Sequence, residues 1–565
     1  MELPPGLYVV NANLLYREGR RVTQIHKTRW DAIIVDEAHH YTDLPDLQPR
    51  TLFRNPKTAT LLLTATPFQL SPQEIKKVFT LTFGGLDLES ARRAGAGLYG
   101  SPDFRQYRAA LNELFQGGHE LSVRTACGLR DSVRATLLPR IVRNPKRDER
   151  HYFLVNEDGQ PSRRPWNPFV LDDAELGQML AAPGLIEFEP EVERAYLEAR
   201  DRVSDAARRG SPTFVAGALR QFLSSWGQFR ASSFARTASI STTSAPHPKM
   251  EACERLIAGI FQKELPGATR GWIGKALVFT TYVGADQGAL AEDHKSYGTS
   301  AALKRALEAR LRSLCPKPNR KTRLAIKARL LGEADRQAMK LSADERKKLR
   351  RALEVFSGSG PAALLLSSPA SLRREARELR RLLDAVGESG NANGTELAPE
   401  TRRRLEERRE RRLQQILNRY TTRDLVARYD GATEAEARDR HLHGFNSPFA
   451  PLVLIASSVA QEGVDLQKYC RHVIHYDLEW NPAKLEQREG RVDRAGRTAD
   501  GPVNVYFLLC RGTYDERVMH VMVNRFRWHQ VLLSKRGALE RAPSGDTEPS
   551  ISPKVMRRVA LDLKP

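Results

Sequence analysis

Short runs of aliphatic residues recur along the chain and predict the strands of parallel β-sheets. Most of them lack polar alternation, which is typical of central strands covered on both faces. The predicted strands span residues 32–35, 59–64, 275–280, 424–429, 452–456, 472–476 and 503–509. Helical patterns are expected over residues 190–208, 214–229 and 249–261, and the spacing of Thr433 and Glu436 predicts a capping box that opens another helix. Strands that alternate with helices predict an α/β fold with doubly wound parallel sheets.

The order of these elements predicts several units. A chain of 565 residues exceeds what a single hydrophobic core usually covers. The predicted division is a first α/β unit over 1–150, a helical connector and linker over 151–246, a second α/β unit over 247–300 and 421–530, a charged helical insertion over 301–420 and a tail over 531–565.

Charge points to a polyanionic partner. The formal net charge is +22 and the pI is near 9.9, which favours nucleic acid as the partner. Residues 301–420 hold 30 Lys and Arg against 15 Asp and Glu, an excess of 15 positive charges. The insertion is therefore the expected contact surface for phosphates; the alternative is a solvated face on which Arg and Glu pair with each other.

Cysteine usage and hydropathy predict a cellular compartment. The five cysteines are scattered without a CxxC pair, as expected of free thiols in a reducing compartment. No apolar run reaches the length of a membrane span, and the first residues lack a signal-peptide pattern. The sequence predicts a cytoplasmic protein that does not enter a membrane and is associated with the nucleoid if bacterial.

Two carboxylates follow the first aliphatic run directly. Asp36 and Glu37 would stand at the carboxyl end of a strand, where open α/β sheets place their ligands. There Asp36 can hold Mg²⁺ and Glu37 can orient or deprotonate a water that attacks a phosphate. The alternative is an ordinary strand end with solvated acids. Thr64 and Thr66 follow the next run and could hydrogen-bond to the acidic pair, although such a turn is common by itself.

The loops of the second unit carry further candidate residues. Gly463 would let the backbone approach a ligand closely, and Asp465 could accept hydrogen bonds from a ribose or from a neighbouring arginine. Arg491 and Arg494 are three residues apart, so on one helical turn both guanidinium groups could face a polyphosphate. The alternative is a basic helix that makes salt bridges with Glu486, Glu489 and Asp493.

Five segments together resemble the motors of helicase superfamily 2. VDEAHH is similar to motif II, LTATPFQ to motif III, KALVFTTY to motif IV, ASSVAQEGVDLQ to motif V and QREGRVDRAGR to motif VI, and they occur in the family's order. The DEAH wording, the HPKM segment and GTYDERV resemble most closely the Swi/Snf-type translocases of double-stranded DNA. The likeness covers about residues 7–150, 247–285 and 424–525.

This resemblance implies two RecA-like lobes, the first incomplete, that use ATP and Mg²⁺ to move on DNA. It gives Asp36 the metal, Glu37 the water and His39 a coupling role between the lobes. Further implied roles are coupling for Thr64 and Thr66, cleft or nucleotide contacts for Gly463, Asp465 and Gln487, arginine fingers for Arg491 and Arg494, and DNA contacts for Asn11, Thr280, Thr281, Tyr282 and Ser457. Arg497 departs from the glutamine that remodelling enzymes usually carry there, which argues against a eukaryotic remodeller but not against a motor.

One part of the family's pattern, a phosphate-binding loop of the form GxxxxGK[ST], is missing from this sequence. Only 35 residues precede Asp36, and the single Gly-Lys pair, Gly274 and Lys275, is followed by Ala276. Three explanations are open: a longer protein, a split motor completed by a partner that carries the loop, or a lobe that has lost hydrolysis. The favoured function is an ATP-driven translocase or helicase that is inactive in isolation; the alternative is a DNA-binding scaffold subunit that does not hydrolyse ATP.

Overall fold

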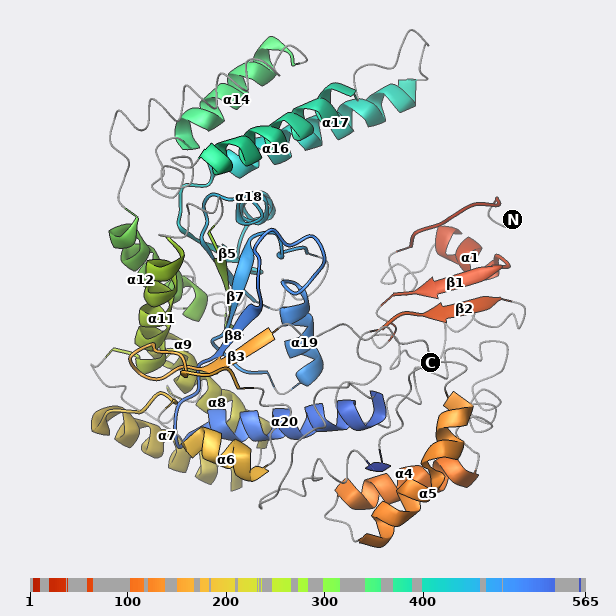
Figure 1. Ribbon diagram of the computed structural model, residues 1–565, viewed down its shortest axis with the longest axis vertical. Helices are drawn as coiled ribbons and strands as arrows, with labels where there is room; N and C mark the ends of the chain where they lie inside the picture. Colours follow the sequence, from red (N-terminus) through yellow and green to blue (C-terminus); the bar gives the residue numbers. More distant parts are fainter. Residues whose placement is uncertain are drawn as a thin grey trace.

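The computed structural model describes residues 4–10, 20–36, 38, 58–64, 102–115, 120–137, 150–166, 173–181, 184–208, 212–230, 232, 235, 246–265, 273–282, 298–315, 341–356, 369–388, 399–457, 464–479, 481–533 and 558–559. These residues form two parallel sheets with helices around them (Figure 1).

The larger sheet has six strands in the order β3-β8-β7-β4-β6-β5, and every pair is parallel. Its strands are β3 (Arg150–Leu154), β4 (Lys275–Phe279), β5 (Val426–Tyr429), β6 (Val453–Ala456), β7 (Cys470–His475) and β8 (Val503–Phe507). The aliphatic runs from residue 275 onward correctly predicted five of them. The sequence pattern did not predict β3, which enters the sheet at its edge beside β8.

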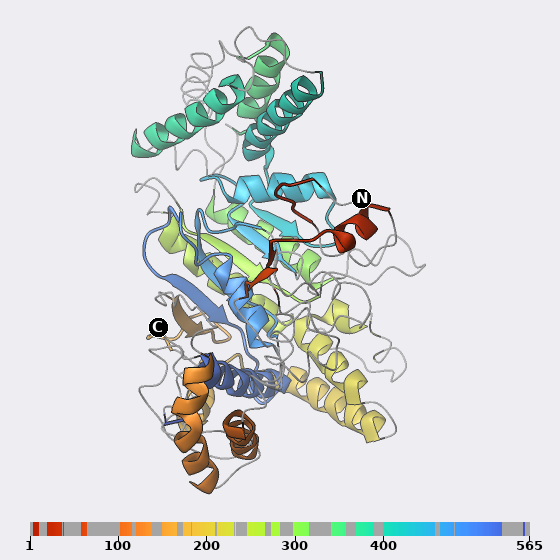
Figure 2. The same cartoon turned by 90° about the vertical axis from the view of Figure 1, so that its right-hand side faces the viewer.

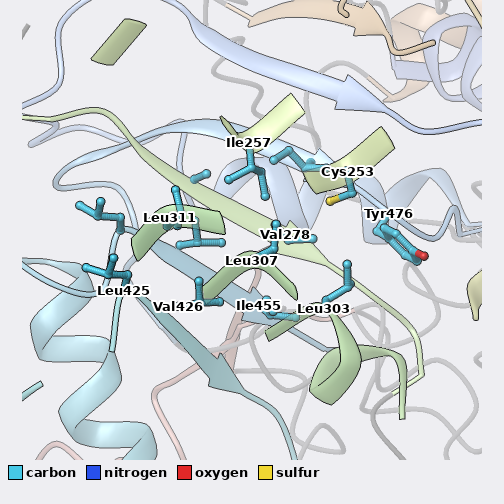
Figure 3. Packing of buried hydrophobic residues seen from close by; sticks show 14 of the residues in the cluster. Cys253, Ile257, Val278, Leu303, Leu307, Leu311, Leu425, Val426, Ile455 and Tyr476 are labelled. Carbon is cyan, nitrogen blue, oxygen red and sulfur yellow. The ribbon is translucent and has the colours of Figure 1, made fainter. Parts of the chain in front are cut away.

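Helices cover both faces of this sheet, which confirms the doubly wound α/β prediction. Along β4, Val278 faces a core built with α11 (Pro248–Glu264) and α12 (Thr299–Leu314), whose packing Figure 3 shows. Its neighbour Phe279 belongs to a second core on the other face. The helices there are α6 (Asp173–Ala181), α18 (Ala435–Phe445), α19 (Pro482–Gly490) and α20 (Tyr514–Leu533). Alternate side chains of each buried strand therefore support opposite layers.

Helices of the predicted connector pack into the same core as the sheet. They are α7 (Pro190–Arg208), α8 (Pro212–Ser224) and α9 (Trp226–Arg230), and they contribute Tyr196, Phe222 and Phe229. The helix α12, which was expected at the start of the insertion, likewise buries Leu303, Leu307 and Leu311 against the sheet.

The smaller sheet contains β1 (Ala32–Val35) and β2 (Ala59–Leu62), paired in parallel with Val35 opposite Leu62. Both strands are predicted correctly, but the expectation that residues 32–35 are buried on both faces is wrong. Ile34 keeps 65% of its surface exposed and Leu61 keeps 52%. Among the residues that the structure describes, these two strands pair only with each other, so their apolar residues are less enclosed than those of a central strand. Figures 1 and 2 both place this pair on the side of the larger sheet that carries α19.

Three further helices belong to the first part of the chain. They are α1 (Arg20–Lys27), α4 (Pro102–Phe115) and α5 (Glu120–Leu137). The helices α4 and α5 pack together, and the hydroxyl of Tyr107 donates to the carbonyl of Val559. This contact brings residues near the end of the chain against α4.

Beyond α12, the described part of the insertion contains three long helices, which lie at one end of the molecule (Figures 1 and 2). They are α14 (Ala343–Phe356), α16 (Pro369–Glu388) and α17 (Pro399–Thr421). The Tyr420 hydroxyl donates to Glu375 at 2.6 Å, and Lys468, just before β7, donates to Glu378 of α16 at 2.8 Å. Leu379, Leu413 and Ile416 also share a hydrophobic core with β5 and β6, and together with Lys468 they fix the helical insertion to the sheet.

The capping box expected at Thr433 is not present. The helix α18 begins after Glu434, and the Thr433 hydroxyl donates to Asp430 at 2.8 Å. Asp430 is fully buried at the end of β5 and also accepts from Arg428, so the threonine satisfies a buried carboxylate rather than the helix.

The five cysteines are free, as expected, and four of them are buried. Among the described helices, none has the length and apolarity that crossing a membrane requires.

Candidate functional site

The candidate site lies at the carboxyl edge of the larger sheet. Because all six strands are parallel, the loops after β4, β6 and β7 emerge at this one edge. They carry Thr280 to Tyr282, Ser457, and the segment that leads into α19. The fold therefore brings together motifs that are separated by up to two hundred residues in sequence.

The loops of motifs V and VI are joined directly. Arg494 donates from its guanidinium to the Asp465 carboxylate at 2.5 Å, and the amide of Leu466 donates to the carbonyl of Arg491. The Asn446 side chain donates to the carbonyl of Asp465 at 2.6 Å. Of the two partners expected for Asp465, the structure contains the neighbouring arginine.

The two arginines of motif VI do not share a helical face. The helix α19 ends at Gly490, and residues 491–494 continue in hydrogen-bonded turns. Arg491 is 8% exposed, whereas the Arg494 side chain is 45% exposed. The expectation of a shared face fails because glycine is a poor helix former and the helix stops before either arginine.

The start of α19 is fixed by its sequence. Asn481 is the N-cap and accepts a hydrogen bond from the amide of Ala483, and Pro482 occupies the first helical position. Gln487 lies on this helix and is partly exposed. The helix therefore begins at a fixed point next to the loop that follows β7.

A third arginine of motif VI, Arg488, was not among the residues expected from the sequence. Its side chain is fully buried, donates to the carbonyl of Asp477 and to the Glu479 carboxylate, and lies over the ring of Phe279. Burial lowers the pKa of Arg488 below its ordinary value. It anchors α19 to the ends of β4 and β7.

Buried acidic residues follow Arg488. Glu489 is paired with Arg150 of β3 and lies 3.4 Å from His475 of β7. Burial alone would raise the pKa of Glu489, but Arg150 and His475 bring it below its ordinary value. Arg150 was also absent from the sequence-based candidates, because only the fold brings it to motif VI.

Asp477 organises the expected DNA-contacting loop after β4. It accepts from the Thr280 hydroxyl and from the Thr281 amide, each at 2.8 Å. Thr280 is fully buried, and burial raises the pKa of the half-buried Tyr282 to about 12. Thr280 thus shapes this loop from inside, while Thr281 and Tyr282 are only partly covered. Ser457 is also buried, and its amide donates to the carbonyl of Tyr429.

Candidates of the first unit meet at the edge of the smaller sheet. Asp36 follows β1 and is exposed, and Thr64 follows β2 closely. The register of β1 and β2 places both after the same pair of strand ends. An exposed carboxylate in this position suits Mg²⁺. The other candidates, Asn11, Glu37, His39, Thr66 and Gly463, lie outside the described residues.

Lys275 does not belong to a phosphate-binding loop. It is the first residue of β4, fully buried, and its Nζ donates to the carbonyl of Gly444 at 2.9 Å. Burial lowers its pKa well below the ordinary value of lysine. It lies at the amino end of a strand, opposite the edge that carries the candidate site.

Comparison with known proteins finds a family model that matches the part of the chain with motifs V and VI. The profile of the family described as helicase conserved C-terminal domain matches residues 382–496, which include motif V and all but the last residue of motif VI. The chain is related to the Swi/Snf-type helicases of superfamily 2. The resemblance stated from the motifs is therefore confirmed.

Individual relatives match short parts of this chain. An uncharacterized ATP-dependent helicase, YqhH of Bacillus subtilis, is 41% identical over 73 residues, 13% of either chain. DNA repair and recombination protein RAD54B of Homo sapiens is 34% identical over 99 residues, 17% of this chain and 11% of that protein. Chromatin-remodeling ATPase INO80 of Gibberella zeae is 32% identical over 112 residues, 20% of this chain and 6% of that protein. The chain thus spans 13% or less of the length of each.

One solved structure, the C-terminal part of the Fun30 ATPase domain, aligns with 44% of this chain and 90% of that chain. The sequence identity is 16% and the TM-score is 0.16. The fold class is therefore assigned from the observed sheet and not from this likeness.

Proposed function

We propose that this chain supplies most of an ATP-dependent motor that moves along double-stranded DNA. The observation that carries the proposal is the junction of motifs V and VI, where Asp465 and Arg494 are paired at the carboxyl edge of the larger sheet. This is the edge at which open α/β sheets bind ligands, and guanidinium groups there are suited to polyphosphate.

Roles for individual residues follow from this arrangement. Asp36 would hold Mg²⁺ and Glu37 would orient the attacking water. His39, Thr64 and Thr66 would couple nucleotide state to movement. Bound Mg²⁺ would neutralise charge on the β- and γ-phosphates.

The second lobe would supply the opposite wall of the nucleotide site. Arg491 and Arg494 would act as arginine fingers, with Gln487, Gly463 and Asp465 beside the nucleotide. An arginine supplied from a second lobe makes hydrolysis depend on closure of the two lobes, which links it to translocation.

A phosphate-binding loop must come from outside this sequence, either from an upstream segment or from a partner. The only Gly-Lys pair in the sequence supports this view, since Lys275 is buried against Gly444. The exposed apolar side chains of Ile34 and Leu61 are suited to be covered by helices of a completed first lobe. Without the loop, we expect no hydrolysis by this chain alone.

The insertion would hold the DNA backbone. Arg404, Arg408 and Arg411 follow an i, i+4, i+7 spacing on α17 and are all exposed, on the side away from the buried Leu413 and Ile416. Arg404 and Arg411 also form salt bridges with Glu400 and Glu407, as the solvated-face alternative predicts. Loops at Asn11, Thr281, Tyr282 and Ser457 would contact the same DNA.

DNA-stimulated ATP hydrolysis tests the proposal. The rate is measured for this chain alone and after the upstream coding region, or a partner that carries the phosphate-binding loop, is added back. Activity that appears only in the completed protein and disappears in Glu37→Gln is the expected result. DNA binding without hydrolysis under every condition would favour the second candidate, a DNA-binding scaffold subunit, for which the exposed basic helix α17 is the supporting observation.

A further inference from the structure

A buried ionic network links the edge strand β3 to motif VI. Arg150, the first residue of β3, donates to the Glu489 carboxylate at 2.5 Å and to the Asp493 carboxylate at 3.2 Å. The Tyr152 hydroxyl donates to Glu489 at 3.0 Å. The acidic side chains are almost completely buried, at 1% exposure for Glu489 and 4% for Asp493.

The partners of Arg150 lie on either side of Arg491 in the chain. Glu489 lies in the last turn of α19, and its carbonyl accepts from the amides of Val492 and Asp493. Asp493 immediately precedes Arg494. One guanidinium therefore holds the chain on both sides of Arg491 and directly before Arg494.

The chemistry of this contact requires arginine. Its planar fork can satisfy two carboxylates at once, whereas the ammonium group of lysine is a point charge. Removing the guanidinium would leave two buried carboxylates without their main positive partner, a costly arrangement in a protein interior. His475, whose Nε2 lies 3.4 Å from the Glu489 carboxylate, has a pKa that burial lowers below the ordinary value.

Arg150 lies where the chain enters the larger sheet. The helix α5 of the first part ends at Leu137, and Arg150 begins the strand by which the chain enters the second sheet, pairing with Val503 of β8. Figure 1 shows β3 beside β8, next to α19. A shift of β3 would thus act on the arginine turn through the Arg150 side chain.

We propose that Arg150 is a positioning residue that sets the turn carrying Arg491 and Arg494 and ties it to the strand through which the chain enters the second lobe. The inference rests on the proposed function for its catalytic consequence, but the contact itself is independent of hydrolysis.

Hydrogen exchange measured by mass spectrometry on the full chain tests the positioning. In Arg150→Met, the amides of residues 490–494 are expected to exchange at least tenfold faster, while β4 and β6 keep their protection. Arg150→Lys is expected to fall between Arg150→Met and the parent. Arg164→Met, which changes an exposed arginine just after β3, is the matched control and should leave exchange unchanged. Unchanged exchange over 490–494, or equal loosening of the whole sheet, would overturn the proposal.

Catalysis gives the second readout in the completed protein that hydrolyses ATP. Arg150→Met should lower kcat at least tenfold and leave the KM for ATP within about threefold, with partial rescue in Arg150→Lys. A parallel loss in Arg164→Met, or a change confined to KM, would contradict positioning. If no preparation hydrolyses ATP, the proposed function fails, whereas the exchange result still decides the role of Arg150.

Discussion

Arg494 donates to Asp465 across the two loops that follow β6 and α19, and both side chains are largely open to solvent. Exposed ion pairs contribute about 1 kcal/mol or less to stability. The contact is therefore weak enough for Arg494 to exchange the carboxylate for a phosphate. It also keeps the Arg494 guanidinium close to the proposed nucleotide site.

The variants Asp465→Asn and Arg494→Met are expected to differ in their effect on ATP affinity. Asp465→Asn removes a carboxylate that competes for the guanidinium, so affinity should stay equal or rise, whereas Arg494→Met should weaken it. Titration of the completed protein with a fluorescent ATP analogue measures both. If Asp465→Asn weakens binding as much as Arg494→Met, Asp465 contacts the nucleotide directly, for example at the ribose.

Salt dependence of DNA binding tests the stripe on α17. Changing Arg404, Arg408 and Arg411 together to Gln should weaken binding and reduce the slope of log K against log salt by about 0.9 for each DNA phosphate that is no longer neutralised. The control changes three exposed arginines of α7, Arg194, Arg200 and Arg202, in the same way. Equal effects of the two triple variants on the salt slope would mean that this face of α17 is solvated and does not contact DNA.

Acid should destabilise the second lobe through buried histidines. Burial lowers the pKa of His247 to about 4, and its Nε2 lies 3.0 Å from the carbonyl of Phe222. The unfolded chain binds a proton at this group near pH 6.5, so its contribution is complete above pH 6.5 and is lost as the pH falls toward 4.

Urea unfolding at pH 7 and at pH 4.5 measures this loss. His247→Gln should reduce the difference by an amount on the order of 3 kcal/mol, since one pKa unit corresponds to ~1.4 kcal/mol. Burial lowers the pKa of His441, His472 and His475 as well, so part of the acid loss should persist. His151→Gln, on the exposed side of β3, is the control. An unchanged acid loss in His247→Gln would show that this histidine does not contribute.

Replacing Lys275 with methionine should stabilise the protein at neutral pH by about 1 kcal/mol. The side chain is fully buried, so at pH 7 folding must either desolvate the charge or release the proton. The carbonyl of Gly444 stays satisfied because the Ser447 hydroxyl also donates to it. Thermal unfolding compares Lys275→Met with Lys263→Met, an exposed change on α11. A large loss of stability in Lys275→Met would mean that the buried lysine stabilises the fold.

The inner strands were predicted well because short contiguous aliphatic runs are typical of strands buried on both faces of a parallel sheet. The sequence did not predict β3, in which Arg150 and the exposed His151 interrupt the apolar pattern of an edge strand. The roles of Arg150 and Arg488 depend on partners up to 343 residues away, which spacing along the chain does not reveal. The pairing of Arg494 with Asp465 was foreseen only as one of two options. The shared helical face of Arg491 and Arg494 was wrong because Gly490 ends the helix.

Single-turnover ATP hydrolysis on DNA, in the completed protein, tests the central claim that acids of one lobe and arginines of the other act on one nucleotide. Glu37→Gln and Arg494→Met are each expected to lower the rate at least 100-fold, and the double variant should be no slower than the slower single variant. Hydrolysis at the parent rate in Arg494→Met, or two losses that multiply in the double variant, would contradict it.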